Sequence, residues 1–126
     1  MLLDGDKQKN IAVIGPNTDS NVALLGNYHD YYGTAFAVLE GLENALPDAR
    51  ITRARGCHLW EDSAEDPGYL GDANSEAVAV AHLVQVVVLY VSLGEIIEGE
   101  EMGKTGETWT GDKGDLLLSK AQQLLL

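Results

Sequence analysis

The residues of this chain that could most readily do chemistry lie between positions 98 and 112, in the segment EGEEMGKTGETWTGD. The segment contains a Gly-Lys-Thr triplet of the kind that ends a phosphate-binding loop. It also carries closely spaced carboxylates, which could serve acid–base catalysis or could simply be solvated. Three interpretations are therefore open: a nucleotide site, a carboxylate site for catalysis, or an acidic surface loop.

Neither nucleotide interpretation fits the residues around the glycines. A phosphate loop requires a glycine, four further residues and then Gly-Lys-Thr, and Glu98 stands in place of that first glycine. Seven carboxylates from Glu95 to Asp115 face two lysines, and such a field opposes a triphosphate. The run IAVIG could begin a dinucleotide fingerprint, but Pro16 follows it and removes a backbone donor from the turn. A nucleotide-binding α/β domain is the less favoured alternative.

Carboxylate chemistry gives the acidic segment a different role. Glycoside cleavage commonly uses two carboxyl groups that flank the scissile bond, one as general acid and the other as nucleophile or base. A carboxyl group crowded by other carboxylates is favoured in its protonated form, which a general acid requires. Glu98, Glu100 and Glu101 would supply such crowding. A solvated acidic loop would show the same residues, so the segment alone does not decide.

Composition narrows the choice of partners. The chain of 126 residues has a formal net charge of −12, from 20 acidic and 8 basic residues, and this excess argues against binding nucleic acid or an anionic membrane. Cys57 is the only cysteine, and no paired Cys or His spacing indicates a metal site. The first residues, MLLDGDKQKN, lack the apolar core of a signal peptide, which favours the cytoplasm. A longer precursor would carry any signal elsewhere, so the compartment stays open.

The elements that must position the acidic segment alternate between strands and helices. We predict strands at NIAVIG (10–15), at ARITRARGC (49–57) and at Val86–Ser92, the last as the most buried strand of the sheet. The order is β-α-β-α-β, which predicts a layered α/β sandwich with a mainly parallel sheet. The acidic segment follows the third strand, and ligands of open α/β sheets gather beyond the carboxyl ends of strands.

Residue patterns typical of helices lie between these strands. We predict a helix over Thr34–Leu46 with Thr34 as N-cap and Pro47 as stop, and a second helix after Ser75, which would cap it. A last helix is expected to start near Asp115 and to end in three leucines with nothing to pack against. We therefore expect a short leader at 1–9 and, over 10–126, a domain truncated at its C-terminus.

Five stretches that together span almost the whole chain occur in this order: NIAVIGPNTDS, LLGNYH, AVLEGLENALPDARITRARGCHL, EAVAVAHLVQVVVLYVSLGEIIEGEE and GDKGDLLLSKAQQLL. Together they resemble the C-terminal α/β sandwich domain of glycoside hydrolase family 3, which contains β-glucosidases and β-xylosidases. The resemblance covers roughly residues 8 to 126. In that family a (β/α)-barrel domain comes first and carries the nucleophilic aspartate, and the sandwich domain contributes the acid/base glutamate.

The resemblance assigns roles within the acidic segment. It implies that Glu100 is the general acid/base, that Asp112 and Glu98 support the site, and that Trp109 could contact the sugar. The other glutamates of the segment are rivals of Glu100 because family members differ here: Glu95, Glu98, Glu101 and Glu107. No metal or cofactor is implied.

This sequence also departs from the family pattern. Gln85 and Gly94 stand where relatives often carry aspartate, Ser92 where they often carry glycine, and Ser119-Lys120 replaces the Leu-Pro that usually opens the last helix. The barrel is absent from these 126 residues, so the resemblance implies part of a retaining β-glycosidase that is inactive alone and acts on a β-linked saccharide. The alternative is a noncatalytic sugar-binding or relic domain of the same fold. The sugar itself is not indicated.

Overall fold

The computed structural model describes residues 7–25, 36–59, 72–93 and 116–126. In chain order the elements are β1 (Asn10–Ile14), the 3-10 helix η1 (Val22–Leu24), α1 (Val38–Ala45), β2 (Arg50–Ala54), α2 (Asp72–Ala81), β3 (Val86–Leu89) and α4 (Lys120–Leu125). The alternation of strands and helices confirms the predicted fold class. None of the helices in the described part of the chain has the length and apolar character needed to cross a membrane.

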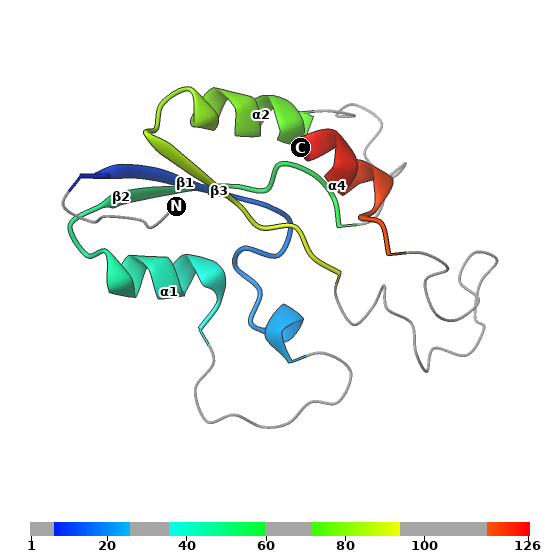
Figure 1. Ribbon diagram of the computed structural model, residues 1–126, viewed down its shortest axis with the longest axis horizontal. Helices are drawn as coiled ribbons and strands as arrows, with labels where there is room; N and C mark the ends of the chain where they lie inside the picture. Colours follow the sequence, from blue (N-terminus) through cyan, green and yellow to red (C-terminus); the bar gives the residue numbers. More distant parts are fainter. Residues whose placement is uncertain (1–6, 26–35, 60–71, 94–115) are drawn as a thin grey trace.

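The three strands form one parallel sheet in the order β2-β1-β3. Asn10 pairs with Arg50 at one border, and Ile11 pairs with Val86 at the other. Helix α1 lies on one face of the sheet, and α2 and α4 lie on the opposite face (Figure 1). The first crossover runs from β1 to β2, and the second runs from β2 back past β1 to β3. Right-handed crossovers in opposite directions place their helices on opposite faces, so this layering follows from the strand order.

The most buried strand is β1, and the prediction that Val86–Ser92 would be the most buried was wrong. Residues 11–14 are at most 2% exposed, whereas β3 forms an edge of the described sheet and leaves Val87 37% and Leu89 42% exposed. A run of apolar residues such as VVVL identifies a strand with two apolar faces. It does not say whether neighbouring strands lie on one side or on both.

The helices begin at other residues than predicted. Helix α1 starts at Val38 after the N-cap Ala37, so Thr34, which lies outside the described residues, is not its N-cap. Helix α2 starts at Asp72, so Ser75 is an interior residue instead of the cap. Helix α4 starts at Lys120 and not near Asp115. Capping residues are frequent in loops and helices alike, so a serine or threonine near a periodic run marks a boundary only loosely.

The main core lies between the sheet and α2. It consists of Ala12, Ile14, Ala54 and Ala77, with Val80, Ala81, Val84 and Leu125 packed against it. Small alanines on both sides allow the helix to approach the sheet closely. The expectation that the three terminal leucines have nothing to pack against was wrong for Leu125, which packs against this core. Leu124 and Leu126 are 66% and 73% exposed. Cys57 is buried just beyond β2.

Candidate functional site

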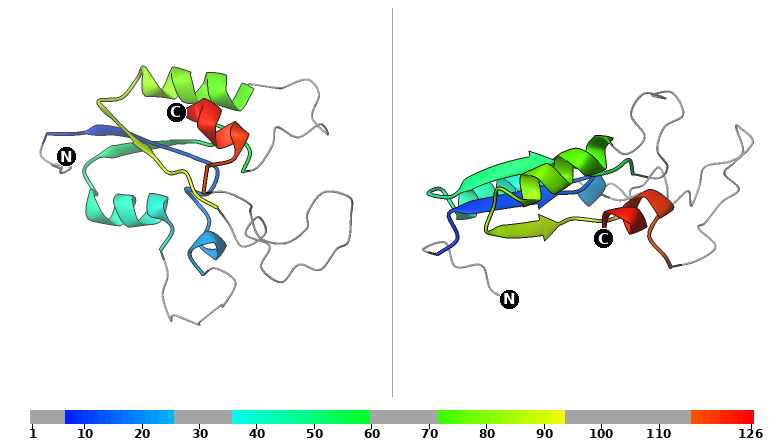
Figure 2. Two further views of the ribbon diagram at one scale, coloured as in Figure 1. Left: turned by 45° about the vertical axis from the view of Figure 1, so that its right-hand side comes forward. Right: turned by 90° about the horizontal axis from the view of Figure 1, so that it is seen from above.

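The candidate site lies at the carboxyl edge of the sheet, where the strand order reverses. Strand β1 is central, with β2 on one side and β3 on the other. The chain therefore crosses first from β1 to β2 and then in the opposite direction to β3. Ligands of open parallel sheets bind beyond the strand ends at this kind of reversal. Helix α4 lies beyond the same strand ends, beside α2 (Figure 2). The loops that leave the three strands and α4 together therefore form this edge.

Gly15 sets the spacing between β1 and β3 at this edge. The Tyr90 amide donates to the Ile14 carbonyl at 2.8 Å, and the Gly15 amide donates to the Ala54 carbonyl at 3.1 Å. A Cβ atom on Gly15 would lie 1.9 Å from the Tyr90 carbonyl oxygen, and the Gly15 φ is +153°. Only glycine fits where the backbones approach this closely. The end of β1 is thus held directly against the chain that leaves β3.

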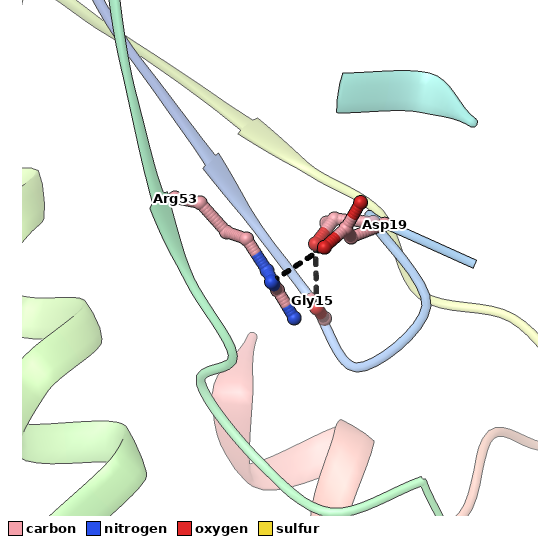
Figure 3. A network of polar contacts seen from close by, with 4 residues as sticks. Gly15, Asp19 and Arg53 are labelled. Atoms are coloured by element: carbon pink, nitrogen blue, oxygen red, sulfur yellow. Dashed lines mark hydrogen bonds and ion pairs between the residues drawn. The ribbon is translucent and has the colours of Figure 1, made fainter. Parts of the chain in front are cut away.

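The loop after β1 is held by three polar side chains, of which Asn17 and Thr18 are buried and Asp19 is exposed. Thr18 is fully buried and its hydroxyl donates to the Gly15 carbonyl at 3.2 Å. One carboxylate oxygen of Asp19 accepts from the Arg53 guanidinium on β2 at 2.7 Å (Figure 3). Asn17 is 8% exposed, and its side-chain amide donates to the Ser92 hydroxyl at 3.0 Å. The loop is therefore tied to β2 on one side and to the chain after β3 on the other.

Gln122 of α4 holds the chain segments that leave β2 and β3. Its side chain is fully buried, and its Oε1 accepts from the Ser92 amide at 2.8 Å. Its Nε2 donates to the Ser92 carbonyl at 2.9 Å and to the Leu59 carbonyl at 2.7 Å. Both donors of Nε2 and the acceptor Oε1 are thereby engaged, as the burial of a polar group demands.

Ser119 completes this network from the N-terminus of α4. As N-cap, its hydroxyl oxygen accepts from the Gln122 amide at 3.3 Å. The same hydroxyl donates to the Leu59 carbonyl at 2.9 Å. Two positions at which the sequence differs from the family that it resembles, Ser92 and Ser119, thus both belong to the network. A third, Gln85, accepts from the Lys9 and Asn10 amides at the opposite end of β1.

The predicted site residues Glu100, Asp112, Glu98 and Trp109 all lie in the segment 94–115, outside the described residues. The same is true of the rival glutamates Glu95, Glu101 and Glu107. What the structure describes is both flanks of this segment. Ser92 before it and Ser119 after it are each hydrogen-bonded to Gln122. The two flanks are therefore held together at the carboxyl edge, where the sequence predicted a site.

The described part of this edge is not built for a nucleotide phosphate. The chain after β1 runs through η1, and α1 begins only at Val38, so α1 does not start in the turn after β1. Near the start of α1, the Leu39 amide already donates to the Thr18 carbonyl at 3.0 Å. Phosphate sites of this fold class rely on free amides where a helix follows the first strand directly. Among the described residues, no group of three or more His, Cys, Asp or Glu side chains could hold a metal ion.

A cavity of about 290 Å³ lies at the other end of the sheet. It is lined by Asn10, Arg50, Thr52, Val80, Leu83 and Val84. None of these residues is a carboxylate, and the strands begin here instead of ending. This cavity is therefore separate from the candidate site.

Sequence reasoning missed Gln122, Ser119 and Asn17. One signal was available: Ser119-Lys120-Ala121-Gln122 has the Ser-x-x-Gln spacing of a capping box, which would have placed the helix start correctly. In a capping box the glutamine side chain turns back to the N-cap amide. Here it reaches the two strand-end segments instead. No local pattern predicts that use.

The fold and this network define the class of protein as an α/β protein with a parallel sheet and a candidate site beyond its strand ends. No family model matches the chain. A similar protein is Beta-D-xylosidase 1 of Arabidopsis thaliana, with 31% identity over 116 residues. The match covers 92% of this chain, and the chain spans only 14% of the length of that relative. The chain is thus related to part of a glycoside hydrolase.

Proposed function

We propose that this chain is part of a retaining β-glycosidase of family 3 type and that its segment 94–115 supplies the general acid/base, Glu100. One observation carries the proposal: the buried side-chain amide of Gln122, on the helix that follows the acidic segment, binds the backbone of Ser92, which precedes the segment, at the sheet edge where α/β proteins bind ligands. The similarity to a β-D-xylosidase supports the substrate class, a β-linked saccharide. On this proposal, residues 10–126 are a partial α/β sandwich domain preceded by a leader at 1–9.

The proposed reaction divides the work between two carboxyl groups. An aspartate on a (β/α)-barrel domain attacks the anomeric carbon while Glu100 gives its proton to the departing glycosidic oxygen. In the second step Glu100 removes a proton from water, and the hydroxide attacks the glycosyl-enzyme and releases the aspartate. Asp112 and Glu98 would support the loop, and Trp109 would contact the sugar. No metal or cofactor takes part.

If the nucleophile and the acid/base lie on different domains, this chain alone lacks one of the two catalytic carboxyl groups. Retaining hydrolysis needs the nucleophile and the acid/base on opposite sides of one glycosidic bond. If the nucleophile is on a barrel domain, these 126 residues hydrolyse nothing unless that domain is present. The choice between a glucosidase and a xylosidase would then also be made mainly by residues of the barrel.

Substitution of Glu100 in the native, barrel-containing protein tests the proposal. Glu100→Ala should lower the rate of hydrolysis of alkyl glycosides by about 100-fold or more, the usual contribution of a general acid. Aryl glycosides with good leaving groups need less protonation, so their glycosylation step should suffer less. Added azide should restore part of the turnover, because it attacks the glycosyl-enzyme without needing a base.

Glu101→Ala is the matched control, since it removes a neighbouring carboxylate of the same segment and should leave both substrates within a few-fold of wild type. Equal losses on alkyl and aryl substrates for Glu100→Ala, without azide rescue, would move the acid/base role to another glutamate. The native mass must be established first, with an antibody to this chain. A band several times larger than 13.5 kDa is expected if a barrel is attached.

A noncatalytic sugar-binding or relic domain of the same fold is the alternative. It predicts a native band at the mass of the short chain and weak saccharide binding without turnover, even when a barrel domain is supplied. Binding of ATP or NAD in a thermal-shift screen would contradict both proposals. The Leu39 amide at the start of α1 already donates to the Thr18 carbonyl, which argues against nucleotide binding there.

A further inference from the structure

Gln122 has the largest polar side chain that the described residues bury completely. Burying an amide is unfavourable unless its donors and acceptor all find partners. The partners of Gln122 are not other side chains but the backbone of Ser92 and Leu59. Each of these two residues lies just beyond a strand, Leu59 after β2 and Ser92 after β3. The amide is therefore placed where it fixes main chain that no strand ladder holds.

The contact with Ser92 has the form of a strand pairing. The Ser92 N–H donates to Oε1 and the Ser92 carbonyl accepts from Nε2, so both backbone groups of one residue meet the same planar amide. A neighbouring peptide chain would offer the same donor and acceptor. The Ser92 hydroxyl in turn accepts from Asn17 at 3.0 Å. All three polar atoms of Ser92 are held, two by α4 and one by the loop after β1.

We propose that Gln122 is a positioning residue for the acidic segment: its amide fixes the point at which the chain leaves β3 and joins it to the end of β2. Only one orientation of the amide serves, because Oε1 faces a donor and Nε2 faces two acceptors. The catalytic part of this inference rests on the proposed function. The fixing of Ser92 does not rest on it, and it can be tested without an activity assay.

The first test compares hydrogen exchange by NMR in the 126-residue chain with and without Gln122→Met, which keeps the side-chain volume and removes the amide. The Ser92 amide should exchange about tenfold faster or more, since it loses its acceptor and the neighbouring carbonyl loses its donor. The Val13 amide in the central strand reports on opening of the whole fold. It should accelerate much less than Ser92.

Gln123→Met is the matched control on the same helix. Gln123 is exposed, and its Nε2 donates to the Leu118 carbonyl at 2.7 Å, within its own segment. This variant should leave the Ser92 amide within about twofold of wild type. An equal acceleration of Ser92 and Val13 in Gln122→Met would mean that Gln122 only stabilises the fold, and the proposal would be wrong.

If the Gln122→Met variant does not fold, an NMR measurement on the wild-type chain still tests the proposal. An NMR coupling across the hydrogen bond, from the Ser92 nitrogen to the side-chain carbonyl carbon of Gln122, should be observed. Slow exchange of the Ser92 amide should accompany it. An unprotected Ser92 amide in the wild-type chain would overturn the proposal without any substitution.

The second test uses the native, barrel-containing protein and the substrates chosen for Glu100→Ala. If Gln122 acts through the acidic segment, Gln122→Met should lower kcat more for alkyl than for aryl glycosides, and it should add little to the loss in Glu100→Ala. A loss that is equal for both substrates would refute a role in positioning the acid/base. The two proposals can fail separately: full activity of Glu100→Ala would remove the proposed acid/base, while selective exchange at Ser92 would still establish Gln122 as the residue that fixes this segment.

Discussion

Substitution of Gly15 by alanine tests whether the close approach of β1 and β3 sets the geometry of the carboxyl edge. The new Cβ would lie 1.9 Å from the Tyr90 carbonyl oxygen and 2.8 Å from its carbon, and real Cβ atoms essentially never approach closer than 3.0 Å. The obstacle is backbone, so no side chain can rotate away. The end of β3 would have to move by about 1 Å, as overpacking of a closely packed interior requires.

Three contributions determine the size of the effect. Displacing β3 by overpacking costs about 1–3 kcal/mol. Weakening the hydrogen bond from the Tyr90 amide to the Ile14 carbonyl, 2.8 Å long, costs about 1 kcal/mol. Alanine at a φ of +153° adds strain of about 1 kcal/mol or more. Gly15→Ala should therefore lower the free energy of unfolding by about 3 kcal/mol or more, a large part of what a small domain has.

Gly41→Ala is the matched control. Gly41 lies inside α1, and no described atom beyond its own helix backbone and chain neighbours lies within 4 Å of a Cβ added there. The same chemical change should raise stability by about 1 kcal/mol, because glycine is the poorer helix former. Urea unfolding of both variants, followed by circular dichroism, gives the two values. A Gly15→Ala chain within about 0.5 kcal/mol of wild type would refute the argument about the β1–β3 approach.

Two further substitutions test the loops of the same edge. Gly56→Ala should lower the free energy of unfolding by about 1–3 kcal/mol, because φ is +74° and the new Cβ would lie 2.7 Å from Leu125 and 2.9 Å from Ile14; an unchanged urea midpoint would contradict this. A double-mutant cycle of Arg53→Ala and Asp19→Ala should give a coupling energy below about 1 kcal/mol that falls with added salt, since the two side chains are 43% and 52% exposed. A coupling energy of more than about 2 kcal/mol would mean that the pair is far better shielded from solvent than its exposure indicates.

The sequence predicted the order of elements because each element carries a local signal. The β-branched runs of β1 and β3 and the period of α1 are properties of neighbouring residues, and the two parallel crossovers follow from their alternation. The strand starts were close, whereas the ends of β2 and β3 and the three helix starts were displaced. Helix starts depend on which polar group satisfies the first amides, and in α4 that group is Ser119 and not a residue near Asp115.

The position of the acidic segment after the third strand was also readable from the sequence, and so was the edge of the sheet at which the chain enters that segment. The roles of Glu100, Asp112, Glu98 and Trp109 came only from a family resemblance, and they remain proposals. The acidic residues themselves could not decide, because crowded carboxylates in a catalytic loop and in a solvated loop have the same composition.

Tertiary structure alone decided which strand is central and what holds the edge together. An apolar run does not encode the number of its neighbours, so β1 and β3 could not be ranked by burial before their pairing was known. The partners of Gln122 are backbone groups 30 and 63 residues away, and every residue type offers such groups. The sequence thus determined the elements through local preferences, while contacts between distant backbone segments, which leave no pattern in the residues, determined how the candidate site is fixed.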